Sequence, residues 1–208
     1  MFIVIEGPNG SGKTTLINNL SKKGCKTLSS PNGTPLAKML RPACRGTGEW
    51  ADLDPTIKFM LFSAARYDEY VRLVHGKKEN VVVDRWWTST YVYQCQLEGV
   101  GVDFLENTIH PEEKIDLVVC LTGDKDTLVK RMEEERAKNP THGLCTWTQD
   151  RKKFEKIIDL YDSLPIYLFE KDIRSLVIDT TDMDENEVME VVWEEIGKIK
   201  FEMEAFGS

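Results

Sequence analysis

The chain has 208 residues, of which 41% are hydrophobic and 30% charged, and its formal net charge is −8. This length suits one α/β domain over residues 1–208. No apolar run reaches the roughly 18 residues of a membrane-spanning helix. The acidic balance argues against broad, sequence-independent binding to nucleic acid. The five cysteines lack C-x-x-C or zinc-like spacing and Met1 leads directly into an apolar run, so we expect free thiols, no cleaved signal peptide and a cytoplasmic location.

The first predicted strand, residues 2–5, runs directly into the most informative motif of the chain. Residues 7–14 read GPNGSGKT, the G-x-x-x-x-G-K-[ST] pattern of a P-loop, and a helical pattern follows. Glycines let successive backbone N–H groups point at phosphate oxygens, and the helix start adds partial positive charge. Lys13 is suited to the terminal phosphates and the Thr14 hydroxyl to Mg²⁺. The motif predicts a nucleoside triphosphate site, because a plain glycine-rich turn would need neither residue.

Apolar runs and helical periodicities alternate along the rest of the chain. Further strands are expected at residues 25–28, 80–84, 117–121 and 176–179. Helices are expected at residues 55–75, 88–97, 125–137, 150–164 and 184–199. Runs that are apolar on both faces suit strands buried between helical layers. With the P-loop, this order predicts an α/β fold of the P-loop kinase type, with a doubly wound, five-stranded parallel sheet flanked by helices.

Two pairs of residues are candidates for chemistry. Asp84 and Arg85 follow a predicted strand, where ligand groups of open α/β sheets gather, so Asp84 could hold Mg²⁺ and Arg85 could clamp a phosphate. The alternative is an aspartate that caps the next helix beside an ion-paired arginine. Phe62 and Arg66 share a helix face and could stack on and hydrogen-bond a base, or could simply be a core residue and a surface residue.

Taken together, these motifs resemble the thymidylate kinase family. The resemblance is carried by EGPNGSGKTT, NGTPLAKML, LFSAAR and VVVDRWWTSTYVYQ, in that order, at residues 6–15, 32–40, 61–66 and 81–94. It extends more weakly to LVKR at 128–131 and to LVIDTTDMDENEV at 176–188. The resemblance implies an ATP- and Mg²⁺-dependent kinase acting on a thymine-like deoxynucleotide, most simply dTMP, and a homodimer formed through helices.

The resemblance also implies roles for individual residues. ATP would be bound by the loop and by two later segments, through Gly7, Asn9, Gly10, Ser11, Gly12, Lys13, Thr14, Thr15, Arg131, Thr180 and Asp182. The catalytic set would be Lys13, Asp84, Arg85 and Arg136, with Thr14 and Asp84 organising Mg²⁺. The acceptor would lie against Phe62, Arg66, Arg85, Ser89, Tyr93 and Gln94, with Tyr93 favouring deoxyribose. Residues 136–150 would form a lid that excludes water.

Three features depart from the family pattern. An acidic residue that contacts the acceptor 3′-hydroxyl usually stands at the position of Asn9. An arginine that holds the acceptor 5′-phosphate usually stands at the position of Ser29, two residues before Pro31. The lid usually carries an Asp-Arg pair followed by an acidic residue, whereas here Arg136 is the candidate for the lid charge.

Two of these departures concern the sugar and phosphate of the acceptor, and they open an alternative. The acceptor could be the hydroxymethyl group of 5-hydroxymethyluracil within DNA, as for phage enzymes that resemble this family, with the base extruded or single-stranded. Trp86, Trp87 and Trp147 could then stack on bases, or could be core or lid residues. A third possibility, a nucleotide-binding regulator without catalysis, is opposed by the intact motif residues.

Overall fold

The computed structural model describes residues 1–109, 113–138 and 150–206. Within them, five strands form one parallel sheet in the order β2-β3-β1-β4-β5. The strands are β1 (Phe2–Glu6), β2 (Lys26–Ser29), β3 (Val81–Asp84), β4 (Leu117–Thr122) and β5 (Ser175–Asp179). Each predicted strand is present to within a residue at either end, so the predicted α/β fold is confirmed. The predicted lid, 136–150, lies mostly outside the described residues, and its role stays a prediction.

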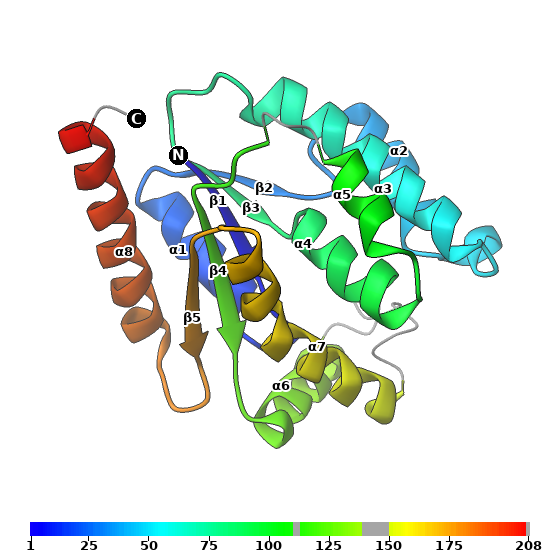
Figure 1. Ribbon diagram of the computed structural model, residues 1–208. Helices are drawn as coiled ribbons and strands as arrows, with labels where there is room; N and C mark the ends of the chain where they lie inside the picture. The colour runs from blue at the N-terminus through cyan, green and yellow to red at the C-terminus, as the bar shows by residue number, and fades with distance from the viewer. Residues whose placement is uncertain (110–112, 139–149, 207–208) are drawn as a thin grey trace.

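Helices cover both faces of the sheet (Figure 1). One face packs against α1 (Lys13–Lys22) and α8 (Glu185–Phe206). The other face packs against α3 (Pro55–Glu69), α4 (Trp87–Thr90) and α7 (Arg151–Glu170). The remaining described helices are α2 (Pro35–Cys44), α5 (Val102–Thr108), α6 (Lys125–Lys138), the 3₁₀ turn Gly48–Trp50 and the π-helical turns Tyr70–Val74 and Tyr91–Leu97. No described helix has the length and apolar character needed to cross a bilayer.

Helices α2 and α5 were not predicted, and the helices predicted at residues 150–164 and 184–199 end before α7 and α8 do, at Glu170 and Phe206. The helix predicted at residues 150–164 ends just before Pro165, a residue that lacks a backbone donor and usually ends a helix. The helix nevertheless continues to Glu170, because buried side chains on either side of the proline, Leu164 and Leu168, hold the next turn against the core. Packing of the apolar face therefore outweighs the local propensity.

Alternation along β1 decides which side chains meet which helices. Phe2 and Val4 belong to the core under α3, α4 and α7, whereas Ile3 and Ile5 belong to the core under α1 and α8. Successive side chains of a strand point to opposite faces, so Glu6 points to the same face as Phe2 and Val4. A carboxyl group is thereby placed in an apolar layer at the carboxyl end of the central strand.

The four cysteines among the described residues are free thiols, and all four are buried. Burial raises the pKa of Cys44 to about 12 and that of Cys95 to about 11. Burial also raises the pKa of Cys120, which lies in β4. Buried thiols with raised pKa values are poor nucleophiles, which agrees with the expectation of free, unreactive cysteines.

Candidate functional site

The loop between β1 and α1 has the backbone geometry that the P-loop motif predicts. Gly10 and Gly12 have φ angles of 80° and 88°, in the left-handed region that favours glycine. A Cβ atom at Gly10 would lie 2.7 Å from the carbonyl oxygen of Leu128 in α6, so only glycine fits there. Gly12 caps α1 without a side-chain hydrogen bond, which leaves backbone N–H groups of the first turn available. These groups and the helix dipole form a site for an anion.

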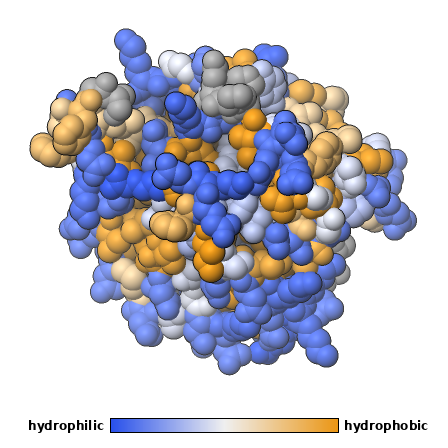
Figure 2. Space-filling view, viewed as in Figure 1, coloured by the Kyte–Doolittle hydropathy of each residue, from blue (hydrophilic) through white to orange (hydrophobic). Residues whose placement is uncertain are grey.

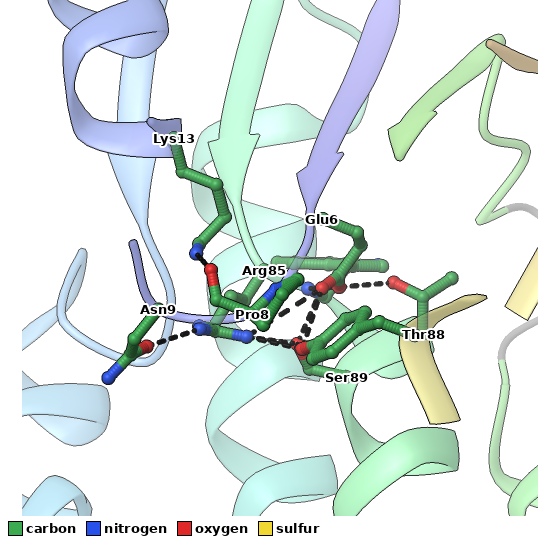
Figure 3. Close-up of polar contacts among 9 residues, drawn as sticks. Glu6, Pro8, Asn9, Lys13, Arg85, Thr88 and Ser89 are labelled. Carbon is green, nitrogen blue, oxygen red and sulfur yellow. Dashed lines mark hydrogen bonds and ion pairs between the residues drawn. The ribbon is translucent and has the colours of Figure 1, made fainter. Parts of the chain in front are cut away.

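Lys13 is the first residue of α1 and lies inside this loop (Figure 3). Its side chain is 8% exposed, and its Nζ donates a hydrogen bond of 2.7 Å to the carbonyl oxygen of Pro8. Burial and the positive charge of nearby Arg85 lower the pKa of Lys13 to about 7. The amine is therefore close to half protonated at neutral pH, and a polyphosphate beside it would raise its pKa.

This pKa predicts that nucleotide binding takes up a proton. At pH 8, one unit above the pKa of about 7, Lys13 is about 10% protonated in the free protein, so binding of a triphosphate should take up close to one proton. Affinity should consequently fall as the pH rises above 7. Titration calorimetry with ATP in buffers of different ionisation enthalpy measures this uptake. The same titration of Lys13→Met should show little uptake, and equal uptake in both proteins would contradict the assignment.

Asp84 and Arg85 lie at the carboxyl end of β3, beside the P-loop. Asp84 Oδ1 is buried and has no hydrogen-bond partner among the described residues. Arg85 has a φ angle of 67°, an uncommon value for a residue with a side chain, and its guanidinium donates to Asn9 Oδ1 at 3.1 Å and to the hydroxyls of Ser89 and Tyr161. Asp84 does not cap the following helix, whose N-cap is Trp86. The alternative of a capping aspartate is therefore wrong.

A cavity of about 170 Å³, the aromatic cavity, opens beside these residues. All six residues predicted to bind the acceptor line it: Phe62, Arg66, Arg85, Ser89, Tyr93 and Gln94. Arg66 is only 3% exposed, and its Nε lies 3.8 Å from Glu113 Oε2. Among the described residues, its terminal nitrogens make only long hydrogen bonds, of 3.5 Å to Thr90 and 3.4 Å to Ser63. Arg66 is thus a buried cation at the cavity wall, so the alternative of a surface arginine is wrong.

A second cavity of about 480 Å³, the phosphate-loop cavity, is lined by the P-loop, α6 and α2. The predicted residues that line it are Asn9, Gly10, Gly12, Lys13, Thr14, Thr15, Asp84, Arg85, Arg131 and Arg136. Five residues line both this cavity and the aromatic cavity: Asn9, Arg41, Arg45, Asp84 and Arg85. The two cavities therefore meet at a wall that carries three guanidinium groups.

A third cavity of about 220 Å³ lies on the other side of the P-loop. Ser11, Arg131 and Thr180 line it, together with Gly10, Gly12 and Thr15. Arg131 donates to the carbonyl oxygens of Thr180 at 3.1 Å and Thr181 at 3.0 Å, which ties α6 to the loop after β5.

Two predicted nucleotide contacts do not line any of these three cavities. Asp182 is exposed, and Met183 and Asp184 line the third cavity instead. Gly7 lies below the loop, where a Cβ atom would meet the carbonyl oxygen of Leu121 at 2.4 Å. Its role is to let the chain pass close to β4.

Arg41 and Arg45 were not among the predicted site residues. Arg41 Nη1 donates to the carbonyl oxygen of Pro31 at 2.8 Å, and burial together with the charge of Arg45 lowers the pKa of Arg41. Neither arginine has an ion-pair partner among the described residues. The signal that could have found them is their spacing of four, which places both on one face of a helix that starts at the Thr34-Pro35 cap.

The tryptophans expected as stacking surfaces are core residues where the structure describes them. Trp86 and Trp87 are each 3% exposed, and the Trp86 indole N–H donates to Glu113 Oε2 at 3.1 Å. Both rings therefore belong to the core, as the core alternative expected, and of the two only Trp86 also lines the aromatic cavity. Trp147 lies outside the described residues.

Comparison with known proteins agrees with the geometry of the site. The sequence profile of the family described as Thymidylate kinase matches residues 5–191. The chain belongs to the thymidylate kinase family. Members of this family are ATP-dependent phosphotransferases, and the protein is accordingly an ATP-dependent kinase.

Individual relatives match over most of their length. The chain is 28% identical over 209 residues to a thymidylate kinase of Staphylococcus haemolyticus (strain JCSC1435), covering 92% of this chain and 96% of the relative. It is 32% identical over 156 residues to a thymidylate kinase of Chlamydia felis (strain Fe/C-56), covering 66% and 72%. A solved structure of thymidylate kinase from Candida albicans has the same fold, with a TM-score of 0.72, 22% identity and coverage of 96% and 92%. None of these relatives supports the phage DNA kinase branch.

Proposed function

We propose that the protein transfers the γ-phosphoryl group of ATP to the 5′-phosphate of dTMP and forms dTDP. The observation that carries this proposal is the common wall of the two cavities, which brings a base-sized aromatic pocket and a polyphosphate loop to one cationic junction. An acceptor phosphate at that junction would face the end of a triphosphate held on the P-loop. Phosphoryl transfer needs mainly such positioning and charge stabilisation.

The aromatic cavity has suitable groups for a thymine. Phe62 offers a ring face for stacking, and the terminal nitrogens of buried Arg66 have donor capacity left for a carbonyl oxygen of the base. A buried guanidinium discriminates strongly between bases. A base that cannot accept from it leaves its N–H donors unpaired, and binding of that base is weakened by the desolvation penalty of those donors. Tyr93 lines the same cavity and would crowd a ribose 2′-hydroxyl.

Arg41 and Arg45 offer an answer to the missing family arginine at Ser29. Both guanidinium groups line the junction without an ion-pair partner among the described residues, so an acceptor phosphate is a suitable partner. Asn9 accepts a hydrogen bond from Arg85 but, unlike an acidic residue, adds no negative charge beside that guanidinium. The departures that suggested a DNA acceptor thus have a local explanation with a free phosphate monoester.

On the donor side, Lys13 and the backbone N–H groups of the loop would hold the ATP phosphates, and Arg131 would lie against the adenine of ATP. Thr14 and Asp84 would hold Mg²⁺: the fit is supported by the buried, unpartnered Asp84 Oδ1 and by the exposed side chain of Thr14. Bound Mg²⁺ would neutralise charge on the phosphate oxygens. Arg85 would stabilise the charge of the transferred group, and Arg136 would add a cation from α6.

The experiment is transfer of labelled γ-phosphate from ATP to two acceptors, free dTMP and a DNA oligonucleotide containing 5-hydroxymethyluracil. We expect label on dTMP only, and Phe62→Ala should raise the KM for dTMP far more than the KM for ATP. Label on the DNA only would overturn the proposal in favour of the DNA kinase. Tight ATP binding without transfer to any nucleotide would favour a regulator.

We further propose that the functional unit is a homodimer in which a second copy packs on α3. Apolar side chains are exposed on one face of this helix and the turn after it, at Ile57, Met60, Ala64, Tyr67 and Val71. Their spacing of three and four residues is that of a helix–helix seam, and orange residues gather over α2 and α3 at the upper right of Figure 2. A stripe of this kind can pack against its own copy about a two-fold axis.

The dimer predicts a change of mass when the stripe is charged. Met60→Lys, at a side chain that is 52% exposed, should halve the mass measured by light scattering after size-exclusion chromatography. The matched control is Phe169→Lys on α7, which is 85% exposed but lies off the stripe and should leave the mass unchanged. A wild-type protein of monomeric mass would contradict the proposal.

A further inference from the structure

Glu6 has a carboxyl side chain, yet it is 0% exposed, and it lies at the carboxyl end of the central strand (Figure 3). Among the described residues, four donors contact its two carboxyl oxygens. Oε1 accepts from the Trp86 backbone N–H at 3.1 Å and the Thr88 hydroxyl at 2.5 Å. Oε2 accepts from the Ser89 hydroxyl at 2.7 Å and the Tyr161 hydroxyl at 3.2 Å. These donors come from α4, the turn before it and α7, so Glu6 joins three segments that surround Arg85.

Glu6 itself does not line the aromatic cavity or the phosphate-loop cavity. Its Oε2 lies 3.9 Å from Arg85 Nη1, too far for a direct hydrogen bond. Between them stand the hydroxyls of Ser89, 3.3 Å from Arg85 Nη1, and Tyr161, which also contacts that nitrogen. Any effect of Glu6 on a bound nucleotide must therefore pass through these two hydroxyls and the guanidinium.

The directions in which the Ser89 and Tyr161 hydroxyl hydrogens point decide whether these hydroxyls can accept hydrogen bonds from Arg85. A hydroxyl has one hydrogen and two lone pairs, so a hydroxyl that donates to Glu6 presents a lone pair elsewhere. Burial raises the pKa of Tyr161 well above its usual value, so this phenol keeps its proton and can donate it. With both hydrogens directed to Glu6 Oε2, the lone pairs of Ser89 and Tyr161 are available for the N–H groups of Arg85, which can only donate.

We propose that Glu6 is a positioning residue for phosphoryl transfer: it orients the hydroxyls of Ser89 and Tyr161 so that they accept from Arg85 and hold its guanidinium at the junction of the two cavities. This inference rests on the proposed role of Arg85 toward the phosphates. Arg85 has a left-handed φ of 67°, and such strain persists only where surrounding contacts fix the residue. Glu6 supports these contacts indirectly, through the hydroxyls of Ser89 and Tyr161.

The substitution Glu6→Gln tests the proposal with almost no change in shape. The Trp86 backbone N–H can only donate, so the amide oxygen of glutamine must take the place of Oε1. The amide NH₂ then faces Ser89 and Tyr161 and donates to them. Their hydrogens must turn away from residue 6. Because the two hydroxyls lie 3.0 Å apart, one of them can donate to the other, but the remaining hydrogen turns toward the guanidinium, so Arg85 loses at least one of its two acceptors.

We expect Glu6→Gln to lower kcat by about 10- to 100-fold, the effect of a small misplacement of a catalytic group, with the KM for ATP within about threefold of the wild-type value. In the Arg85→Ala background, Glu6→Gln should lower kcat by less than about a further twofold, because the effects of residues that act as one unit are not additive. Additive losses in this double-mutant cycle, or a wild-type kcat for Glu6→Gln, would overturn the proposal.

Thr88→Val is the matched control, since it removes a donor to the other carboxyl oxygen and does not contact Arg85. It should lower the melting temperature while kcat stays within about twofold of wild type, the small effect expected away from the reacting groups. If both variants lose activity in proportion to their loss of stability, Glu6 has only a structural role and the proposal fails. Wild-type transfer to dTMP is measured first: its absence would count against the proposed function alone, and the cycle would then use whichever acceptor the wild-type protein phosphorylates.

Discussion

Replacement of Arg85 by alanine should lower turnover by about 10³-fold or more, while the fold stays intact. The Arg85 guanidinium is one of three at the junction of the two cavities and could contact both a donor and an acceptor phosphate, and arginines in such positions contribute about 10³ to 10⁵ in rate. Because this stabilisation is expected mainly in the transition state, the dissociation constant of ATP should change much less than kcat. Single-turnover transfer of labelled γ-phosphate measures the first quantity and titration calorimetry the second.

Arg72→Ala provides the control for Arg85→Ala. The Arg72 side chain is 65% exposed and pairs with Asp68 one helical turn away, so its loss should affect neither turnover nor folding appreciably. A comparison of Arg85→Gly with Arg85→Ala adds a test of the backbone. At a φ angle of 67°, glycine should be more stable than alanine by about 1 kcal/mol, the reverse of the order found in ordinary helices and strands. Turnover of Arg85→Ala within tenfold of wild type would contradict its role.

Replacement of Lys13 should abolish transfer and at the same time leave the protein at least as stable. Lys13→Ala removes the cation that the P-loop directs at the phosphates, so turnover should fall by more than about 10³-fold. The stability effect follows from the pKa of about 7, which is below the usual value of 10.5 because burial penalises the charged amine. That penalty is complete below pH 7 and fades as the pH rises toward 10.5.

The stability effect is best measured with Lys13→Met, which keeps the length of the side chain. Its melting temperature should exceed that of the wild-type protein at pH 6, and the difference should shrink as the pH is raised to 9. Lys22→Met, an exposed lysine in the last turn of the same helix, should show neither the loss of transfer nor the pH-dependent gain. Normal activity in Lys13→Ala would overturn the whole assignment of the site.

The fold was predictable from sequence because its signals are local. Every strand except β2, which reads KTLS, is a short run rich in β-branched and other apolar residues, and the P-loop has a fixed spacing between a strand and a helix. Arg41 and Arg45 were missed because the internal proline, Pro42, argues against a helix there, although α2 is amphipathic and buries Ala37, Ala43 and Cys44. Asp182 was assigned from the resemblance as part of the loop after β5, but Thr180 and Asp184 line the third cavity and Asp182 does not.

Glu6 was missed for a different reason. As the last residue of a strand it resembles an ordinary polar terminus, and its four donors come from residues 80 to 155 positions away in the chain. Only the alternation of β1 hints at its burial, since Glu6 has the same parity as core residues Phe2 and Val4. Contacts of such separation are decided by the assembled sheet and not by local sequence.

The reactivity of the buried cysteines can be used to measure local and global unfolding of the protein. A thiol reagent can reach Cys44 in α2 only when that helix detaches, and Cys120 in the central sheet only when the core opens. Labelling rates of the two thiols, separated by mass spectrometry, would therefore measure local and global unfolding in one sample. A nucleotide that binds against Arg41 and Arg45 should slow the labelling of Cys44, which is their neighbour on α2, and so occupancy of the junction would be recorded by a thiol that never contacts the ligand.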